Sequence, residues 1–433
     1  MTDTTSASAA SPSGKINWTS AEIGARVKAR NRSEAKLKYI GLAAIGFAFT
    51  MLAILIGSLV LTGRHAFTQT HVTLDVTFSQ EFINPENLAR SDYRGLMQAS
   101  VAASLPGLAD DEQRKAVGVL SNAAQFTARD RIVAEPTLIG QTVQLNVPTS
   151  DVFDQLAKGL IDRDTPEQFR RLKDDEIAIF DRMVADDRVT NPFNTALFNN
   201  ADSRFPELAG LRGAIVGSFW ALLTCFVLSF PIGIGAAIYL EEFAPKNKVS
   251  DFIEVNINNL AAVPSVVFGL LGLAVFIGAF GMGRSVPLVG GMVLALMTLP
   301  TIIIATRAAL KAVPPSIREA ALGVGASRQQ VVFQHVLPLA MPGILTGTII
   351  GLAQALGETA PLLLIGMNAF VTAAPATPFD ASTALPTQIF IWADSPERGF
   401  ASRTSAAILV LLGFLVTMNA VAIYLRSRFE RNW

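Results

Sequence analysis

The sequence predicts an all-α integral membrane protein with six transmembrane helices and one inserted extracytoplasmic α+β domain. Of its 433 residues, 51% are hydrophobic and only 16% are charged, whereas soluble domains carry about a quarter charged residues. Six stretches of at least 22 residues each contain no charged residue, and about 20 apolar residues cross a bilayer core. More than half of all charges lie in residues 64–212. Most of the chain is therefore expected in a membrane, with one polar domain outside it.

The charge-free stretches set the spans, and the basic residues around them set the orientation. The predicted spans lie near residues 40–62, 213–239, 256–279, 286–306, 341–366 and 404–425. With both termini inside, the cytoplasmic segments hold 16 Lys and Arg residues and the short external loops hold three. This asymmetry is the positive-inside pattern. It predicts a basic cytoplasmic segment at 1–39, a first helix at 40–63, five helices within 213–425, and a cytoplasmic tail at 426–433.

The first 39 residues and the insert differ in composition from the spans. Residues 1–20 are rich in Ser, Thr and Ala and are expected to be disordered, whereas 20–38 predict a basic helix that leads into the first span. Residues 64–212 hold 22 acids and 16 bases. Within them, alternation predicts strands at 71–78 and 142–147, and helices are expected at 151–161 and 167–184. Two acidic clusters, 110–112 and 174–176, are interpreted as solvated faces.

Several classes of function are disfavoured by composition. The 35 basic and 35 acidic residues cancel, which argues against a nucleic-acid-binding protein. One cysteine and three scattered histidines do not form a metal-binding pattern. The chain has no G-x-x-x-x-G-K-[S/T] phosphate-binding loop. We therefore expect no enzymatic activity, no metal and no cofactor.

The cytoplasmic loop 311–338 has strong local signals. Pro314 and Pro315 should end the preceding helix. Ser316 with Glu319, and Ser327 with Gln330, match the capping-box spacing. Two short helices at an angle are therefore predicted, joined by a turn at Gly323 and Gly325, with Ala320 and Ala321 allowing another surface to come close.

This loop resembles the EAA loop of permeases from ATP-binding-cassette importers. The resemblance rests on Glu319-Ala320-Ala321, Gly325, and Leu337-Pro338. It implies a transmembrane fold of the type I importer permease kind and a coupling helix that sits in a groove of a partner ATPase dimer. The coupling residues would be Glu319, Ala320, Ala321, Gly323, Gly325, Leu337 and Pro338. An ordinary capped helix–turn–helix remains the alternative.

Two further stretches narrow the resemblance to permeases of the Pst type, which import phosphate. They are residues 258–270 and the run Gly357-Glu-Thr-Ala-Pro-Leu-Leu363, whose Thr-Ala-Pro continuation is similar to the PstA kind of subunit. The resemblance implies a second, PstC-like permease, a periplasmic phosphate-binding protein, and an inner-membrane location in contact with lipid. Residues 64–212 resemble an extracytoplasmic domain of unknown function found in a subset of these permeases. Alternatives are a permease for sulfate or molybdate, a secondary transporter, or a membrane-anchored sensor.

The resemblance also indicates a translocation path along Pro264, Ser265, Arg307, Gln354, Glu358 and Thr359. Glu358 is an acid inside a predicted span, where such residues usually face a bundle interior or an aqueous path. Gln354 stands where the family often has an arginine. The missing positive charge could come from Arg307 or from the partner permease, and Arg307 could equally be a membrane anchor. Glu358 could be a gate paired with a cation, a protonated acid, or a structural residue. Gly343, Gly347 and Gly351 are interpreted as a helix-packing ridge.

Overall fold

The computed structural model describes residues 21–429, and most of them are helical. Within this part of the chain five helices are long and apolar enough to cross a membrane: α1 (Ala21–Gly63), α8 (Arg212–Ile238), α11 (Pro287–Ala312), α14 (Leu337–Gly357) and α17 (Gly399–Phe429). A sixth span results if α9 (Lys248–Ala261) and α10 (Ser265–Leu271) are counted together with the π-helical stretch Gly272–Ala279. The all-α membrane fold is confirmed.

The expected third span at 256–279 is not one straight helix. α9 and the helix that follows it are bent by 103°, and the break falls at Ala262, Val263 and Pro264. Pro264 has no N–H to continue the helix, and it disfavours a helical conformation at the residue before it. The predicted span at 256–279 is therefore broken at this proline, a bend that a count of uncharged residues does not reveal.

Helix α1 is a single helix from Ala21 to Gly63, so the predicted basic helix and the first span are continuous where the structure describes them. The apolar side chains of its span are exposed, for example Phe47 and Leu61. The predicted disorder of residues 1–20 lies outside the described residues.

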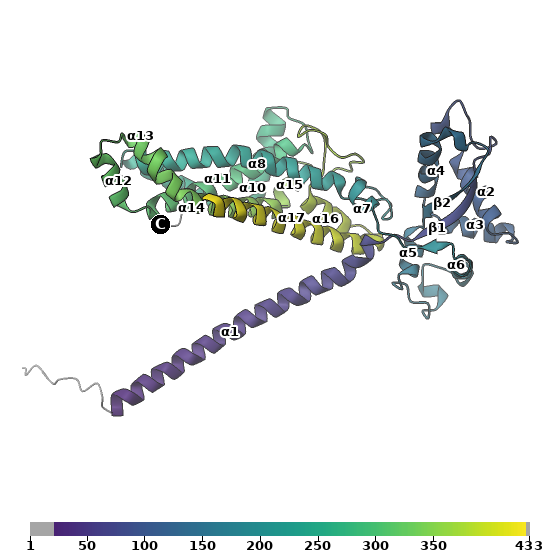
Figure 1. Cartoon of the computed structure of the whole chain (residues 1–433), viewed down its shortest axis with the longest axis horizontal. Coiled ribbons are helices and arrows are strands. Elements are labelled where there is room, and N and C mark those ends of the chain that lie inside the picture. The colour runs from purple at the N-terminus through teal and green to yellow at the C-terminus, as the bar shows by residue number, and fades with distance from the viewer. Residues whose placement is uncertain (1–20, 430–433) are drawn as a thin grey trace, which may run out of the picture. The chain divides into compact units, whose positions relative to one another are not determined.

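Helices α8, α11 and α14 pack closely because small residues face one another. A Cβ on Gly343 would lie 2.8 Å from the Ala309 Cβ of α11. Gly347 faces Ala305 in the same way, one helical turn further along. Figure 1 shows α8 and α11 side by side, with α12 at one end of this bundle and α16 (Leu385–Ala393) toward the other. The interpretation of the glycines as a packing ridge is confirmed.

The polar region between α1 and α8 contains a three-stranded antiparallel sheet in the order β2-β1-β3. Its strands are β1 (His71–Thr77), β2 (Thr142–Pro148) and β3 (Val189–Thr190). The predicted strands at 71–78 and 142–147 are confirmed to within one residue. Alternate residues of β1 are buried, namely Val72, Leu74 and Val76, because successive side chains of a strand point to opposite faces.

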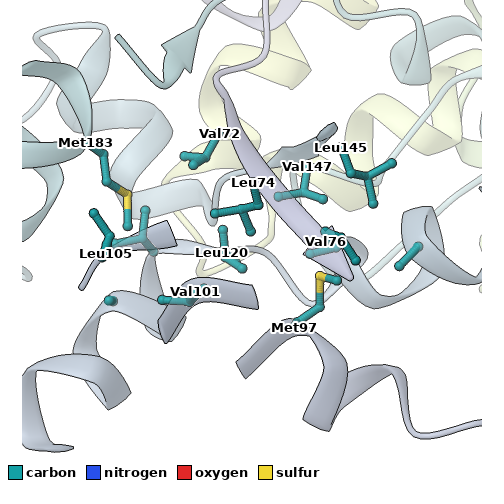
Figure 2. Packing of buried hydrophobic residues seen from close by; sticks show 14 of the residues in the cluster. Val72, Leu74, Val76, Met97, Val101, Leu105, Leu120, Leu145, Val147 and Met183 are labelled. Carbon is teal, nitrogen blue, oxygen red and sulfur yellow. The ribbon is translucent and has the colours of Figure 1, made fainter. Parts of the chain in front are cut away.

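Helices of this region cover the sheet and complete its own hydrophobic core. Figure 2 shows Leu74 and Val147 of the sheet packed with Val101 and with Met183 from two helices. The helices are α2 (Tyr93–Ser104), α3 (Asp110–Val119), α4 (Ala123–Ala134), α5 (Asp151–Ala157) and α6 (Asp174–Ala185), followed by the short α7 (Ala196–Asn199). The α+β character of the insert is therefore confirmed.

The helix expected at 167–184 begins seven residues later. Glu167–Phe169 form only a 3-10 turn, and α6 starts at Asp174. The Glu176 carboxylate accepts a hydrogen bond from the Lys173 N–H at 2.8 Å, which caps the helix. Asp174, Asp175 and Glu176 thus occupy the first helical turn, where negative charge is stabilising. This acidic cluster therefore marks the start of α6, which the sequence predicted too early.

Charged and polar groups are buried where α5 meets the beginning of α17. The Lys158 ammonium contacts Asp154 at 2.6 Å, and the Asp154 carboxylate also accepts the Thr70 N–H at 2.8 Å. Arg403, only 4% exposed, donates to the Ala209 carbonyl at 2.9 Å and to the Gln69 side chain at 3.0 Å. A cavity at this contact is lined by Asp151, Asp154, Lys158 and Arg403, among others. The sheet region and the last span are thus in contact through buried polar and charged groups.

Candidate functional site

Helix α12 (Pro315–Gly323) is held by both of its ends. Pro315 occupies the first helical position, where its missing N–H costs nothing. At the other end, Gly325 adopts a left-handed φ of +89°. The Ala326 N–H then donates to the Ala321 carbonyl at 3.1 Å, and the Gly325 N–H donates to Leu322 at 2.9 Å. This pair of bonds is a Schellman motif, which explains why glycine is required at 325.

Of the two predicted capping boxes, one is present. Ser327 caps α13 (Arg328–Gln330): the Gln330 N–H donates to its hydroxyl at 3.3 Å, and the Ser327 N–H donates to the Gln330 side chain at 2.8 Å. The box at Ser316 was wrong, because Pro314 is the residue that precedes α12 and Ser316 already lies inside the helix. The second short helix was also wrong, because α13 runs through the π-helical stretch Val331–Val336 into α14.

The exposed part of α12 and its turn, residues 319–325, forms a surface that we call the docking turn. Five of the seven predicted coupling residues lie on it: Glu319, Ala320, Ala321, Gly323 and Gly325. All of them except Ala321 are exposed, and Val324 is 86% exposed. Ala321 packs into a buried apolar cluster with Val313 and Val332. The two remaining residues, Leu337 and Pro338, are half-buried at the start of α14.

A group of six ionic side chains adjoins the docking turn, and the sequence reading missed it. Arg307 of α11 bonds Glu241 at 3.3 Å and Glu254 of α9 at 2.9 Å. Arg318 of α12 bonds Glu242 at 2.8 Å. Lys311 lies 3.6 Å from Glu241. We call these residues, Glu241, Glu242, Glu254, Arg307, Lys311 and Arg318, the charge clasp. The sequence contained a hint of this group, because three of its members, Glu241, Glu254 and Arg307, bound charge-free stretches.

Glu358 lies at a break in the fifth span and not inside a continuous helix. α14 ends at Gly357, and Glu358 has extended backbone angles, φ −76° and ψ 121°. A short helix, α15 (Ala360–Leu364), follows Thr359. Both Glu358 and Thr359 are half-buried, and Gln354 is exposed one turn earlier. The predicted span 341–366 is therefore interrupted at Glu358 and Thr359. Pro361 offers no N–H for a further helical bond, which favours the break.

The two broken spans are brought together. α10, which begins directly after Pro264, packs against α15, and a Cβ on Gly269 would lie 2.7 Å from the Pro361 Cα. Ser265 precedes Gly269 by about one turn, and Glu358 precedes Pro361 by three residues. Four of the predicted path residues, Pro264, Ser265, Glu358 and Thr359, thus lie on or beside two short helices in contact.

Arg307 does not join this group. The α14 residues Gly343 and Gly347 lie opposite Ala309 and Ala305 of α11. Arg307 is therefore level with a part of α14 at least 11 residues before Glu358, roughly 16 Å away at 1.5 Å per residue. Its guanidinium is bound to Glu241 and Glu254. The expectation that Arg307 supplies the cation for Glu358 was wrong for this arrangement.

Comparison with known protein families identifies two regions. Residues 229–431 match the family described as "Binding-protein-dependent transport system inner membrane component". Residues 24–167 match a domain of unknown function, DUF3333. The first match contains α9 to α17, including the docking turn and both broken spans. The second contains α1 and most of the sheet region.

Curated relatives agree with these matches. The probable ABC transporter permease protein YqgI of Bacillus subtilis is 36% identical over 36% of this chain, but the match spans only about half, 52%, of that protein. The phosphate transport system permease protein PstA 1 of Mycobacterium tuberculosis is 31% identical over 50% of this chain and 70% of its own length. An inward-facing MetNI methionine ABC transporter chain shares 16% identity, with a TM-score of 0.42, over 51% of this chain and 98% of its own. The protein therefore belongs to the family of inner-membrane permease components of binding-protein-dependent ABC transporters, whose ATPase is a separate subunit.

Proposed function

We propose that the chain is the permease subunit of an ATP-driven importer that carries inorganic phosphate across the inner membrane. The observation that carries the proposal is the docking turn: a Schellman-capped helix that exposes Ala320 and Val324 at one end of a membrane bundle. Exposed apolar residues that gather on one surface, here with Leu322 at 49% exposure, are typical of a binding site for a partner protein. The relatives named as phosphate permeases support the choice of substrate.

The partners follow from the same assignment. An ATPase dimer would bind the docking turn, a PstC-like permease would complete the membrane unit, and a phosphate-binding protein would deliver the substrate from outside. Glu319, Ala320, Ala321, Gly323 and Gly325 would form the contact with the ATPase, and Leu337 and Pro338 would anchor it to α14. Pro264, Ser265, Gln354, Glu358 and Thr359 would line the path, with the compensating positive charge supplied by the partner permease.

The assignment includes an orientation in the membrane. Both termini and residues 311–338 would be cytoplasmic, and residues 64–212 would be outside. Single cysteines at Asp175 and Ser327, in a Cys225→Ser background, test this with a membrane-impermeant thiol reagent. Both native residues are exposed, so labelling should depend on the side of the membrane alone. Labelling of position 327 from outside would reverse the orientation.

Uptake of radiolabelled phosphate by a strain lacking its own phosphate permease tests the function. Cells that express this chain with its cognate partners should accumulate phosphate, and excess sulfate or molybdate should not compete. Competition by either oxyanion would contradict specificity for phosphate.

A further inference from the structure

The charge clasp joins four helices at the end of the bundle that carries the docking turn. Its two neighbouring acids, Glu241 and Glu242, lie in the π-helical turn Tyr239–Phe243 that ends α8. They bind different arginines. Glu241 accepts from Arg307 of α11, and Glu242 accepts from Arg318 of α12. The clasp contains three acids and three bases, so it has no excess charge that would call for a bound ion.

Arg318 fastens α12 to the bundle through three acceptors. Besides Glu242 it donates to the carbonyls of Val313 at 2.7 Å and Leu310 at 2.9 Å, which end α11. The Glu242 side chain is only 11% exposed, and ion pairs shielded from solvent are screened less than surface pairs. A displacement of α12 must therefore move these groups with it or break the contacts.

Arg307 extends the connection to the broken third span. Its second guanidinium bond, 2.9 Å to Glu254, is with α9. α9 turns by 103° into α10, and α10 packs through Gly269 on Pro361, close to Glu358. A continuous series of contacts thus leads from the docking turn to the break at Glu358. Two elements in it, the π-helical turn and the 103° bend, are departures from regular helix of the kind found at sites of movement.

We propose that Arg307 and Arg318 are positioning residues that transmit movement of the docking turn to α9 and thereby to the contact between α10 and α15. The inference rests on the proposed function, in which an ATPase moves α12. Neither arginine touches substrate or nucleotide. Their role is to make α12 and α9 move as one unit, so that ATP hydrolysis is converted into transport.

Neutralising the acids tests the link while the arginines stay in place. Glu242→Gln removes the ion pair between α12 and the end of α8, and Glu254→Gln removes the ion pair between α11 and α9. The matched control is Asp251→Asn, which removes the same charge from an exposed position of α9 that has no ion pair among residues 21–429. Phosphate uptake and ATP hydrolysis are measured on the complete importer in proteoliposomes. Each clasp variant should lower the phosphate imported per ATP at least about fivefold, the lower range of measured couplings between sites, with ATP hydrolysis retained. Asp251→Asn should behave as wild type.

The outcomes separate this inference from the function on which it rests. A wild-type complex that hydrolyses ATP but imports no phosphate would refute the proposed function. If the wild type imports phosphate and both clasp variants keep its ratio of import to hydrolysis, the link is refuted. It is equally refuted if uptake and hydrolysis fall in proportion as the complex loses its ATPase, because the clasp would then only hold the structure together.

Discussion

Gly325 combines a backbone requirement with a position at the centre of the docking turn. Its φ of +89° is in the left-handed region, and no atom lies within 4 Å of where a Cβ would be. A side chain here would therefore cost roughly 1–2 kcal/mol of backbone strain but would not clash within the chain. A loss of transport larger than this strain explains would therefore come from a clash with a partner protein.

We therefore expect Gly325→Trp to abolish phosphate uptake while membrane insertion stays normal. Gly140→Trp is the matched control, because Gly140 has a similar φ, +85°, with equally open surroundings, and lies in the sheet region before β2. It should lose comparable stability and keep uptake. If Gly325→Trp takes up phosphate at the wild-type level, the docking turn is not the element that couples the permease to the ATPase.

Glu358 presents a different problem at the same scale, because phosphate is an anion and an unpaired carboxylate on its route would repel it. With Arg307 bound to Glu241 and Glu254, the cation for a gate would have to come from the second permease. We expect Glu358→Gln to lose uptake with normal assembly of the complex, and Gln354→Arg to be tolerated. Near-normal uptake by Glu358→Gln would indicate a protonated acid, and loss of assembly would indicate a structural residue.

At single positions, a capping signal predicted the structure correctly only where no second signal competed with it. Ser327 was correctly predicted as a helix cap because nothing else competes for the role. Ser316 was not, because the two prolines before it had already started the helix. The partners of Arg307 could not be predicted at all, since Glu241 and Glu254 are distant in sequence and are brought near by packing.

At the scale of elements, the length and apolarity of the spans were predicted, but their breaks were not. The counts that found 256–279 and 341–366 treat each uncharged residue alike, whereas Pro264 and Pro361 withdraw backbone donors. Both prolines were visible in the sequence. What could not be foreseen is that the two short helices after the breaks, α10 and α15, contact each other, because this depends on tertiary packing.

The contact between α10 and α15 leads to a stability prediction. A Cβ on Gly269 would lie 2.7 Å from the Pro361 Cα, a backbone atom that cannot rotate away. Gly269→Leu should therefore destabilise the bundle by about 1–3 kcal/mol, the usual cost of overpacking. Gly235→Leu in α8 is the control, since nothing lies within 4 Å of its Cβ position. Thermal unfolding of the two variants in detergent should show a lower midpoint for Gly269→Leu alone.

At the scale of the whole molecule, composition alone separated the membrane bundle from the polar insert, and paired strands confirmed the insert's α+β character. The buried polar contact between the insert and the last span could not be predicted from the sequence. Arg403 looked like a charge at the end of a span, yet it is 4% exposed and bound to Ala209 and Gln69. Three segments that are far apart in the sequence meet at Arg403, and no local sequence pattern predicts such a contact.

Because charged side chains line this contact, the attachment of the insert should depend on pH. Burial, together with the nearby carboxylates of Glu207 and Asp154, raises the pKa of Asp151 from 3.8 to about 6, although Arg403 and the Gln155 side chain act in the opposite direction. Burial also lowers the pKa of Lys158, with Asp154 opposing it. An acid with a raised pKa in the folded state stabilises that state fully below its ordinary pKa, and the contribution is lost as the pH rises through the folded value. Asp151 should therefore favour the contact below about pH 4 and cease to do so above about pH 6.

Asp151→Asn removes the titrating group and keeps its shape, so it should flatten the pH dependence of thermal stability between pH 4 and 6 and raise the unfolding midpoint at pH 7. The control is Asp175→Asn, whose carboxylate is held by Lys115 on the surface of the sheet region. Hydrogen bonding to Lys115 lowers the pKa of Asp175, so the sign reverses: its stabilisation is present at neutral pH and is lost as the pH falls. The two variants should thus change the pH profile in opposite directions. A profile that Asp151→Asn leaves unaltered would mean that the buried carboxylate is already compensated, and that pH does not govern how the insert is held to the last span.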